Sequence, residues 1–201
     1  GSITIAAINF DASGATTLTV SGANTFTVSG LIDVSDTTAA PIIVVNNALT
    51  IFNGAATNTG GGTNATIVKI ESGKVLTLGG SGSLGLMQIQ GNNAAEGKVI
   101  VSADRDITGT VGANNAIADL QLDATLTVNT GAVAVTNLDI NAGSLIGTNA
   151  SITVTGATTL DGGDITSAGA ITLATTQINE DVTITSGANA DQTFGGTIRG
   201  D

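Results

Sequence analysis

The sequence has 201 residues and a formal net charge of −11, and it contains neither cysteine nor histidine. These absences exclude disulfides, thiolate or imidazole metal sites, and catalysis by Ser-His-Asp or Cys-His groups. A basic stripe able to follow a phosphate backbone cannot be built from five scattered cations, so we expect no nucleic-acid partner. These cations are Lys69, Lys74, Lys98, Arg105 and Arg199.

The composition is that of an ordered chain with an unusual bias toward small residues. Charged residues make up 10%, against roughly 25% in an average domain. The 41% of apolar residues argues against disorder, because disordered chains combine low hydrophobicity with high net charge. No apolar run approaches the ~20 residues of a membrane span, so we expect no membrane insertion.

Short alternating segments run along almost the whole chain and predict β-strands. In each, apolar and small polar residues alternate, and Gly, Asn, Asp or Ala then interrupts the pattern. In chain order the predicted strands are 3–5, 18–20, 26–28, 43–45, 49–51, 68–70, 76–78, 99–101, 120–122, 126–128, 138–140, 152–154, 171–173 and 182–184.

The segment after Ser151 illustrates how the alternation assigns faces. Ile152 and Val154 should point to one side of a strand and Thr153 and Thr155 to the other, which is the pattern of a half-buried strand. No stretch of ten residues shows an uninterrupted helical period, so we expect no significant helix.

Two architectures fit many short, evenly spaced strands: an antiparallel sandwich or barrel, and a parallel solenoid. Hairpins need tight turns such as Asn53-Gly54 or Asp161-Gly162, but most gaps are looser, and a sandwich core usually contains more than four aromatic residues. We therefore predict an all-β parallel β-helix, or β-solenoid, of about ten short coils at ~20 residues each, forming one domain over residues 1–201.

The middle of the chain resembles a known family of repeats. The runs 106–112, 117–122 and 126–128 (DITGTVG, IADLQL and LTV) look like repeats of type V secreted autotransporter passengers. They are most similar to the large rickettsial-type surface antigens, outer membrane protein B and its relatives, and more loosely to filamentous haemagglutinin. The resemblance is clearest from about Val75 to Leu173. It implies a parallel β-helix on the bacterial cell surface, used for adhesion or as a coat, and it brings no catalytic residues.

That family also carries a signal peptide and a C-terminal translocator barrel. The start Gly1-Ser2-Ile3 has neither a basic region nor an apolar signal core, and we find no barrel in the sequence. We therefore expect the chain to be a mature piece or fragment of a larger extracellular protein.

Paired carboxylates are the candidate chemistry of the chain. Polysaccharide-processing β-helix enzymes use such groups as acid and base, or to hold calcium. Asp104 and Asp106 are the best candidates, because they should share one strand face with Arg105 on the opposite face. The alternative is that they are solvated surface charges, and the absence of Tyr and Trp argues against a sugar cleft. We expect no metal or cofactor.

Two further patterns have functional and structural interpretations. Arg199-Gly200-Asp201 spells an integrin-type cell-attachment tripeptide, which is also short enough to arise by chance. Threonine columns suggest the flat array of an ice-binding solenoid, although Thr also has high strand propensity and here the Thr-x-Thr motif is intermittent. They comprise Thr17, Thr19, Thr27, Thr153, Thr155, Thr172, Thr183 and Thr185.

The sequence therefore predicts a non-catalytic structural or adhesive module of a secreted bacterial surface protein. We expect it to associate end to end with another copy or with flanking repeats of its parent protein, and to contact a host-cell receptor or a surface glycan. The alternatives are a polysaccharide-processing enzyme and an ice-binding protein.

Overall fold

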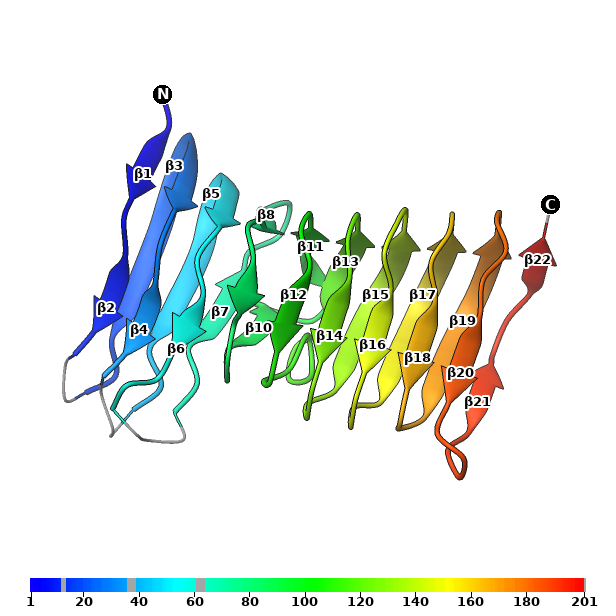
Figure 1. Ribbon diagram of the computed structural model, residues 1–201. Helices are drawn as coiled ribbons and strands as arrows, with labels where there is room; N and C mark the ends of the chain where they lie inside the picture. The colour runs from blue at the N-terminus through cyan, green and yellow to red at the C-terminus, as the bar shows by residue number, and fades with distance from the viewer. Residues whose placement is uncertain (12–13, 36–38, 61–63, 201) are drawn as a thin grey trace.

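The fold of the chain was obtained as a computed structural model, which describes residues 1–11, 14–35, 39–60 and 64–200. These residues form strands, turns and loops without a helix, stacked as a parallel β-solenoid of about nine turns. At about 4.8 Å per turn, the stack is roughly 40 Å long. Figure 1 shows the strands side by side from the N-terminal to the C-terminal end. No described helix is long and apolar enough to cross a membrane.

One sheet runs the whole length of the stack and is called the long sheet below. It contains 13 strands, and neighbouring strands pair in parallel. They are β1 (Ile3–Ile5), β3 (Thr17–Val28), β5 (Ile42–Phe52), β7 (Ile67–Ile70), β8 (Val75–Leu78), β10 (Gln88–Gly91), β11 (Glu96–Val101), β13 (Ile117–Leu122), β15 (Val133–Ile140), β17 (Ile152–Leu160), β19 (Ile171–Ile178), β21 (Gln192–Phe194) and β22 (Ile198–Gly200).

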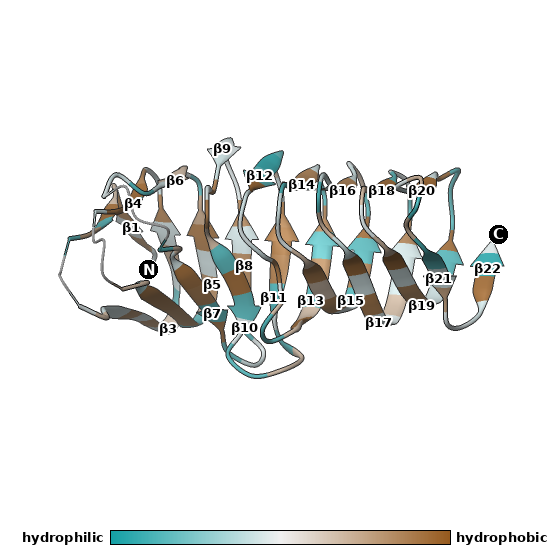
Figure 2. Ribbon diagram, turned by 90° about the horizontal axis from the view of Figure 1, so that it is seen from below, coloured by the Kyte–Doolittle hydropathy of each residue, from teal (hydrophilic) through white to brown (hydrophobic). Residues whose placement is uncertain are grey.

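The opposite side of the stack is formed by two short sheets (Figure 2). The first comprises β2 (Ile8–Phe10), β4 (Ile32–Val34) and β6 (Ala56–Thr57). The second comprises β9 (Gly82–Ser83), β12 (Arg105–Ile107), β14 (Leu126–Val128), β16 (Leu145–Gly147), β18 (Ile165–Ser167) and β20 (Ile184–Ser186). The two sheets are separate, so the ladder on this side is interrupted between β6 and β9.

The core consists of aliphatic columns that run along the stack. One column passes through Leu78, Val101, Leu122, Ile140 and Leu160, all fully buried and in register from strand to strand. Period-two alternation generates such columns, because every second side chain of each strand points inward. The predicted architecture is therefore confirmed, with about nine turns.

The assigned faces of the 152–155 segment are also confirmed. Ile152 and Val154 are buried, Thr153 is partly exposed and Thr155 is exposed. Several predicted strands prove to be halves of one longer strand: segments 18–20 and 26–28 both belong to β3, whose register against β5 shifts between Gly22 and Thr25. The last predicted strand is displaced, since β20 starts at Ile184 rather than Val182.

Candidate functional site

The predicted carboxylate pair lies in a groove where the second short sheet begins. The groove has a volume of about 360 Å³ and is formed by β9, β12 and the segment 125–127. Gly82 and Ser83, the two exposed residues of β9, contribute only small side chains to the lining. The lining residues are Gly82, Ser83, Asp104, Arg105, Asp106, Thr125 and Thr127.

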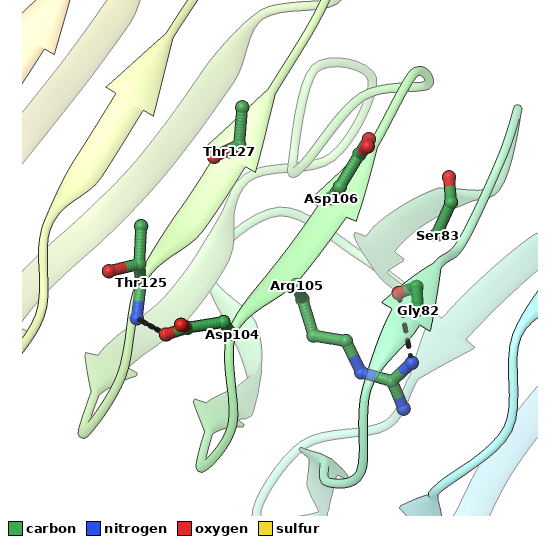
Figure 3. Close-up of a pocket in the computed structure, with 7 residues that line it drawn as sticks. All are labelled: Gly82, Ser83, Asp104, Arg105, Asp106, Thr125 and Thr127. Atoms are coloured by element: carbon green, nitrogen blue, oxygen red, sulfur yellow. Dashed lines mark hydrogen bonds between the residues drawn. The ribbon is translucent and has the colours of Figure 1, made fainter.

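Alternation along β12 separates the acids from the cation. Asp106 lies on the outer face, and Arg105 points away from it, beneath the sheet (Figure 3). Arg105 is only 2% exposed, whereas Asp104 is exposed and Asp106 partly so. The sequence-based placement of two acids opposite one cation therefore matches the structure, but the cation lies in the core.

Each carboxylate accepts a hydrogen bond from the next turn of the solenoid. The backbone N–H of Thr125 donates to Asp104 Oδ1 at 2.9 Å, and Asn129 Nδ2 donates to Asp106 Oδ1 at 2.5 Å. These bonds stabilise coil-to-coil stacking. Asp164, further along the stack, makes the same contact, accepting from the backbone N–H of Thr183 at 2.7 Å. Because the same contact recurs, these carboxylates have a structural role in joining successive turns.

Arg105 is the unexpected residue of this region. Its guanidinium replaces an aliphatic side chain in the inward column that continues through Leu126 and Leu145, and Gly82 beside it contributes no side chain to that space. Nη1 donates to the carbonyl oxygens of Gly54 at 2.9 Å and Gly82 at 3.2 Å. The alternation pattern predicts only that residue 105 points inward. It does not predict that a charged side chain occupies this inward position.

The second terminal nitrogen of Arg105 completes the arrangement. Nη2 donates to the carbonyl oxygen of Phe52 at 2.7 Å and to that of Gly79. Burial lowers the pKa of Arg105, and Nε is buried without a hydrogen-bond partner among the described residues. A guanidinium nevertheless stays protonated, so four carbonyl dipoles solvate this charge across the interruption between the short sheets.

The groove thus presents two carboxylates, a serine and two threonines, which accept hydrogen bonds from hydroxyl groups or attract a cation. Within the described parts of the chain, no three His, Cys, Asp or Glu residues are grouped so that they could hold a metal ion. Arg105 is the cation among the lining residues, and its side chain points inward, away from the outer face on which a ligand would bind.

The cell-attachment tripeptide is only partly described. Arg199 and Gly200 belong to β22, where they pair in register with Gln177 and Ile178, and both are exposed. Asp201 lies outside the described residues. The tripeptide therefore begins within an edge strand rather than on a loop.

Only part of the predicted threonine set forms columns. In the next strand, Thr17, Thr19 and Thr27 lie beside Ile42, Val44 and Ile51. Thr153, Thr172 and Thr193 lie in register on three successive turns of the long sheet, next to Ala134. On the second short sheet, Thr127, Thr166 and Thr185 share a column that Ile146 interrupts.

Comparison with known proteins adds no relative. No family model matches the chain, and no curated protein or solved structure resembles it significantly. The resemblance of its repeats to autotransporter passengers therefore stays a prediction.

Proposed function

We propose that the chain is a non-catalytic structural and adhesive module of an extracellular bacterial surface protein. The observation that carries this proposal is the open-ended stack, in which the same parallel ladder repeats along the long sheet. Among the described strands, β1 pairs only with β3, and β21 and β22 pair only with β19. The other edge of each terminal strand keeps backbone groups that can pair with a further strand.

The exposed terminal strands can accept either flanking repeats of a parent protein or another copy of the chain. Ile3 in β1 is 55% exposed and Ile198 in β22 is 49% exposed, so apolar side chains accompany the unpaired backbone groups at both ends. A head-to-tail contact does not close on itself and therefore builds a filament. A stiff rod or filament suits a surface coat or an adhesin that holds its binding face away from the cell.

Assembly of the isolated chain tests this proposal. We expect sedimentation velocity to show larger species as the concentration rises, and small-angle scattering to show growth in length at constant cross-section. Thr4→Lys places a charge on the edge strand β1 and should suppress this growth. Thr153→Lys, on an internal strand, is the matched control and should leave it unchanged. A strict monomer up to millimolar concentration, with Thr4→Lys identical to the parent, contradicts end-on assembly.

The groove at Asp104 and Asp106 is the observation that favours the alternative of a polysaccharide-processing enzyme. That activity would require the two carboxylates to act as acid and base on one glycosidic bond. Release of reducing ends from acidic and neutral polysaccharides, abolished by Asp104→Asn and by Asp106→Asn separately, would favour the enzyme over the proposed module.

A further inference from the structure

A second groove gathers two of the few cations of the chain beside one acid, Asp119. It lies on the long sheet, between the turn 71–74 and the segment 95–98, and has a volume of about 240 Å³. Lys74 and Lys98 both line it, although the whole chain has five Lys and Arg residues and a net charge of −11. Since salt screens charges beyond about 8 Å, a small anion at this groove experiences chiefly the nearby charges, which are the two lysines and the acids around them.

The strand register brings the two lysines together. β11 pairs with β8 so that Lys98 lies beside Val75, and the backbone N–H of Lys98 donates to the carbonyl oxygen of Lys74 at 2.9 Å. Neither lysine side chain forms a hydrogen bond or an ion pair with the part of the chain that the structure describes. Both ammonium groups therefore keep their donors for a ligand.

The acids near these lysines are Asp119, Glu71, Glu96 and Asp139. Glu96, in the segment 95–98 beside the groove, accepts hydrogen bonds from the backbone N–H and from Nδ2 of Asn93 at 2.9 and 3.1 Å. Asp119 lies beside Lys98 in the next strand and accepts a hydrogen bond from Asn137 Nδ2 at 2.9 Å. Glu71, at the start of the turn that carries Lys74, accepts one from Asn92 Nδ2 at 3.2 Å. Asp139 lies one strand beyond Asp119, near enough for Lys98 to favour its ionised form. Amide donors leave a carboxylate charged, so an incoming carboxylate meets repulsion from these acids as well as two ammonium groups without an ion-pair partner among the described residues. Direct hydrogen bonds from the two lysines must therefore carry its binding.

The wall of the groove is held in a fixed, strained shape. Ala95 has a φ of 57° and is the only non-glycine residue with positive φ among those described. Such a conformation is unfavourable for a residue with a Cβ atom and needs support from its surroundings. The support comes from the next turn, where the carbonyl oxygen of Ala116 accepts the Ala95 N–H at 2.9 Å.

The rest of the lining indicates the type of molecule that the groove fits. Val75 and Ala95 give it an aliphatic surface, Ser72 adds a hydroxyl, and Asp119 adds an acceptor beside Lys98. The volume is below that of pockets for drug-sized ligands, which matches one small ring. A single sugar ring with a carboxylate combines an anion for the lysines, hydroxyls for Ser72 and Asp119, and a CH face for the aliphatic surface.

We propose that this groove binds the carboxylate-bearing ring of an acidic sugar, such as a uronate unit of a surface glycan. The inference rests on the adhesive side of the proposed function and specifies its ligand class. It is separate from end-on assembly, because Lys74 and Lys98 lie in internal turns of the stack.

Chemical-shift titration of the intact chain with glucuronate, glucose and acetate at low salt tests the assignment. We expect glucuronate to bind at least about tenfold more tightly than glucose or acetate, a difference of about 1.4 kcal/mol. Lys74→Gln with Lys98→Gln should weaken glucuronate binding by about tenfold or more. Lys69→Gln, a lysine outside the groove, should change it less than about twofold.

The remaining outcomes overturn the proposal. Equal binding of acetate and glucuronate would show a simple charge contact rather than sugar recognition, and undiminished binding by the double variant would place the site elsewhere. The melting temperature of the double variant should stay close to that of the parent, because neither side chain forms a hydrogen bond or an ion pair among the described residues and Lys98 acts on Asp139 only through its charge. Sedimentation of the same samples separates the two proposals: failure of glucuronate binding with intact assembly removes only the sugar site.

Discussion

The guanidinium of Arg105 donates a 2.7 Å hydrogen bond to the backbone carbonyl of Phe52, which lies 53 positions earlier in the chain. This contact spans three turns of the solenoid, because the intervening turn supplies the carbonyl oxygens of Gly79 and Gly82 to the same guanidinium. It lies where the first short sheet ends and the second begins. A buried cation therefore joins two sheets that share no ladder hydrogen bonds among their described strands.

Arg105→Met should destabilise the fold strongly for this reason. The substitution removes all four donated hydrogen bonds, each contributing about 1 kcal/mol, although the carbonyl oxygen of Phe52 still accepts the N–H of Gly79 at 3.0 Å. We expect a loss of about 3 kcal/mol or more in the free energy of unfolding, measured by urea denaturation. Arg199→Met, at an exposed arginine, should change it by less than about 0.5 kcal/mol. Equal effects of the two substitutions would contradict the structural role of Arg105.

Opposite faces of one strand give a second prediction. Val154 is 1% exposed, and Val154→Asp would bury a carboxylate among aliphatic side chains, at a cost of several kcal/mol. Thr153 is partly exposed on the other face, so Thr153→Asp should cost less than about 1 kcal/mol. Equal shifts of the denaturation curves for both variants would contradict the assignment of Val154 to the buried face and Thr153 to the exposed face.

The sequence predicted these faces because alternation is a local property, and Leu126, Val128, Ile152 and Val154 display it directly. The side formed by the two short sheets was mostly missed. Its strands are two or three residues long and contain Asp106, Gly147 or Ser167, so composition alone makes them look like turns. Their strand character comes from pairing with the turns above and below, which is information that no single segment contains.

The candidate sites differ in the same way. Alternation placed Asp104 and Asp106 on one face correctly, since both lie on one short segment. The groove of Lys74 and Lys98 depends on the register between β8 and β11, which brings together residues 24 positions apart, and on the left-handed conformation of Ala95. The number of residues per turn varies along the chain, so neither property could be deduced from the order of residues.

Asp139 and Asp33 should give opposite pH dependences. Burial and the nearby carboxylates of Asp161 and Asp123 raise the pKa of Asp139 above its ordinary value of 3.8, and Lys98 partly offsets this. A raised pKa means that the native state binds more protons, so the contribution of Asp139 to stability falls as pH rises from about 4 through the native pKa. Asp139→Asn should therefore stabilise the fold at pH 7 and have little effect at pH 3.

Asp33 provides the contrast. The Thr59 side chain gives the largest lowering of the pKa of Asp33, and burial opposes it; Thr57 and backbone hydrogen bonds also lower it. Thr59 Oγ1 and Thr57 Oγ1 each donate at 2.7 Å. A lowered pKa means that ionised Asp33 stabilises the native state. Its contribution to the free energy of unfolding is present above about pH 4 and is lost as pH falls through the lowered native pKa. Asp33→Asn should destabilise the fold at pH 7 and not at pH 2. Thermal melts at both pH values check the signs, and parallel behaviour of the two variants would refute them.

The alternation of Asp and Asn on successive turns gives the last prediction. Asn141 Nδ2 donates to Asp123 Oδ1 at 2.8 Å, and Asn179 donates in the same way to Asp161, so each amide in this column serves a carboxylate one turn earlier. Asn141→Asp would remove a donor and place three carboxylates on consecutive turns about 4.8 Å apart. We expect a loss of about 1–2 kcal/mol at pH 7 and low salt, which shrinks in 1 M salt and at pH 3 because screening and protonation both weaken the repulsion.

Asn149→Asp makes the same charge change at an exposed position with no side-chain hydrogen bond among the described residues, and should cost less than about 0.5 kcal/mol. Urea denaturation measures both losses of unfolding free energy. Equal losses in the two variants, unchanged by salt or pH, would show that the amides do not keep the carboxylates of the column apart.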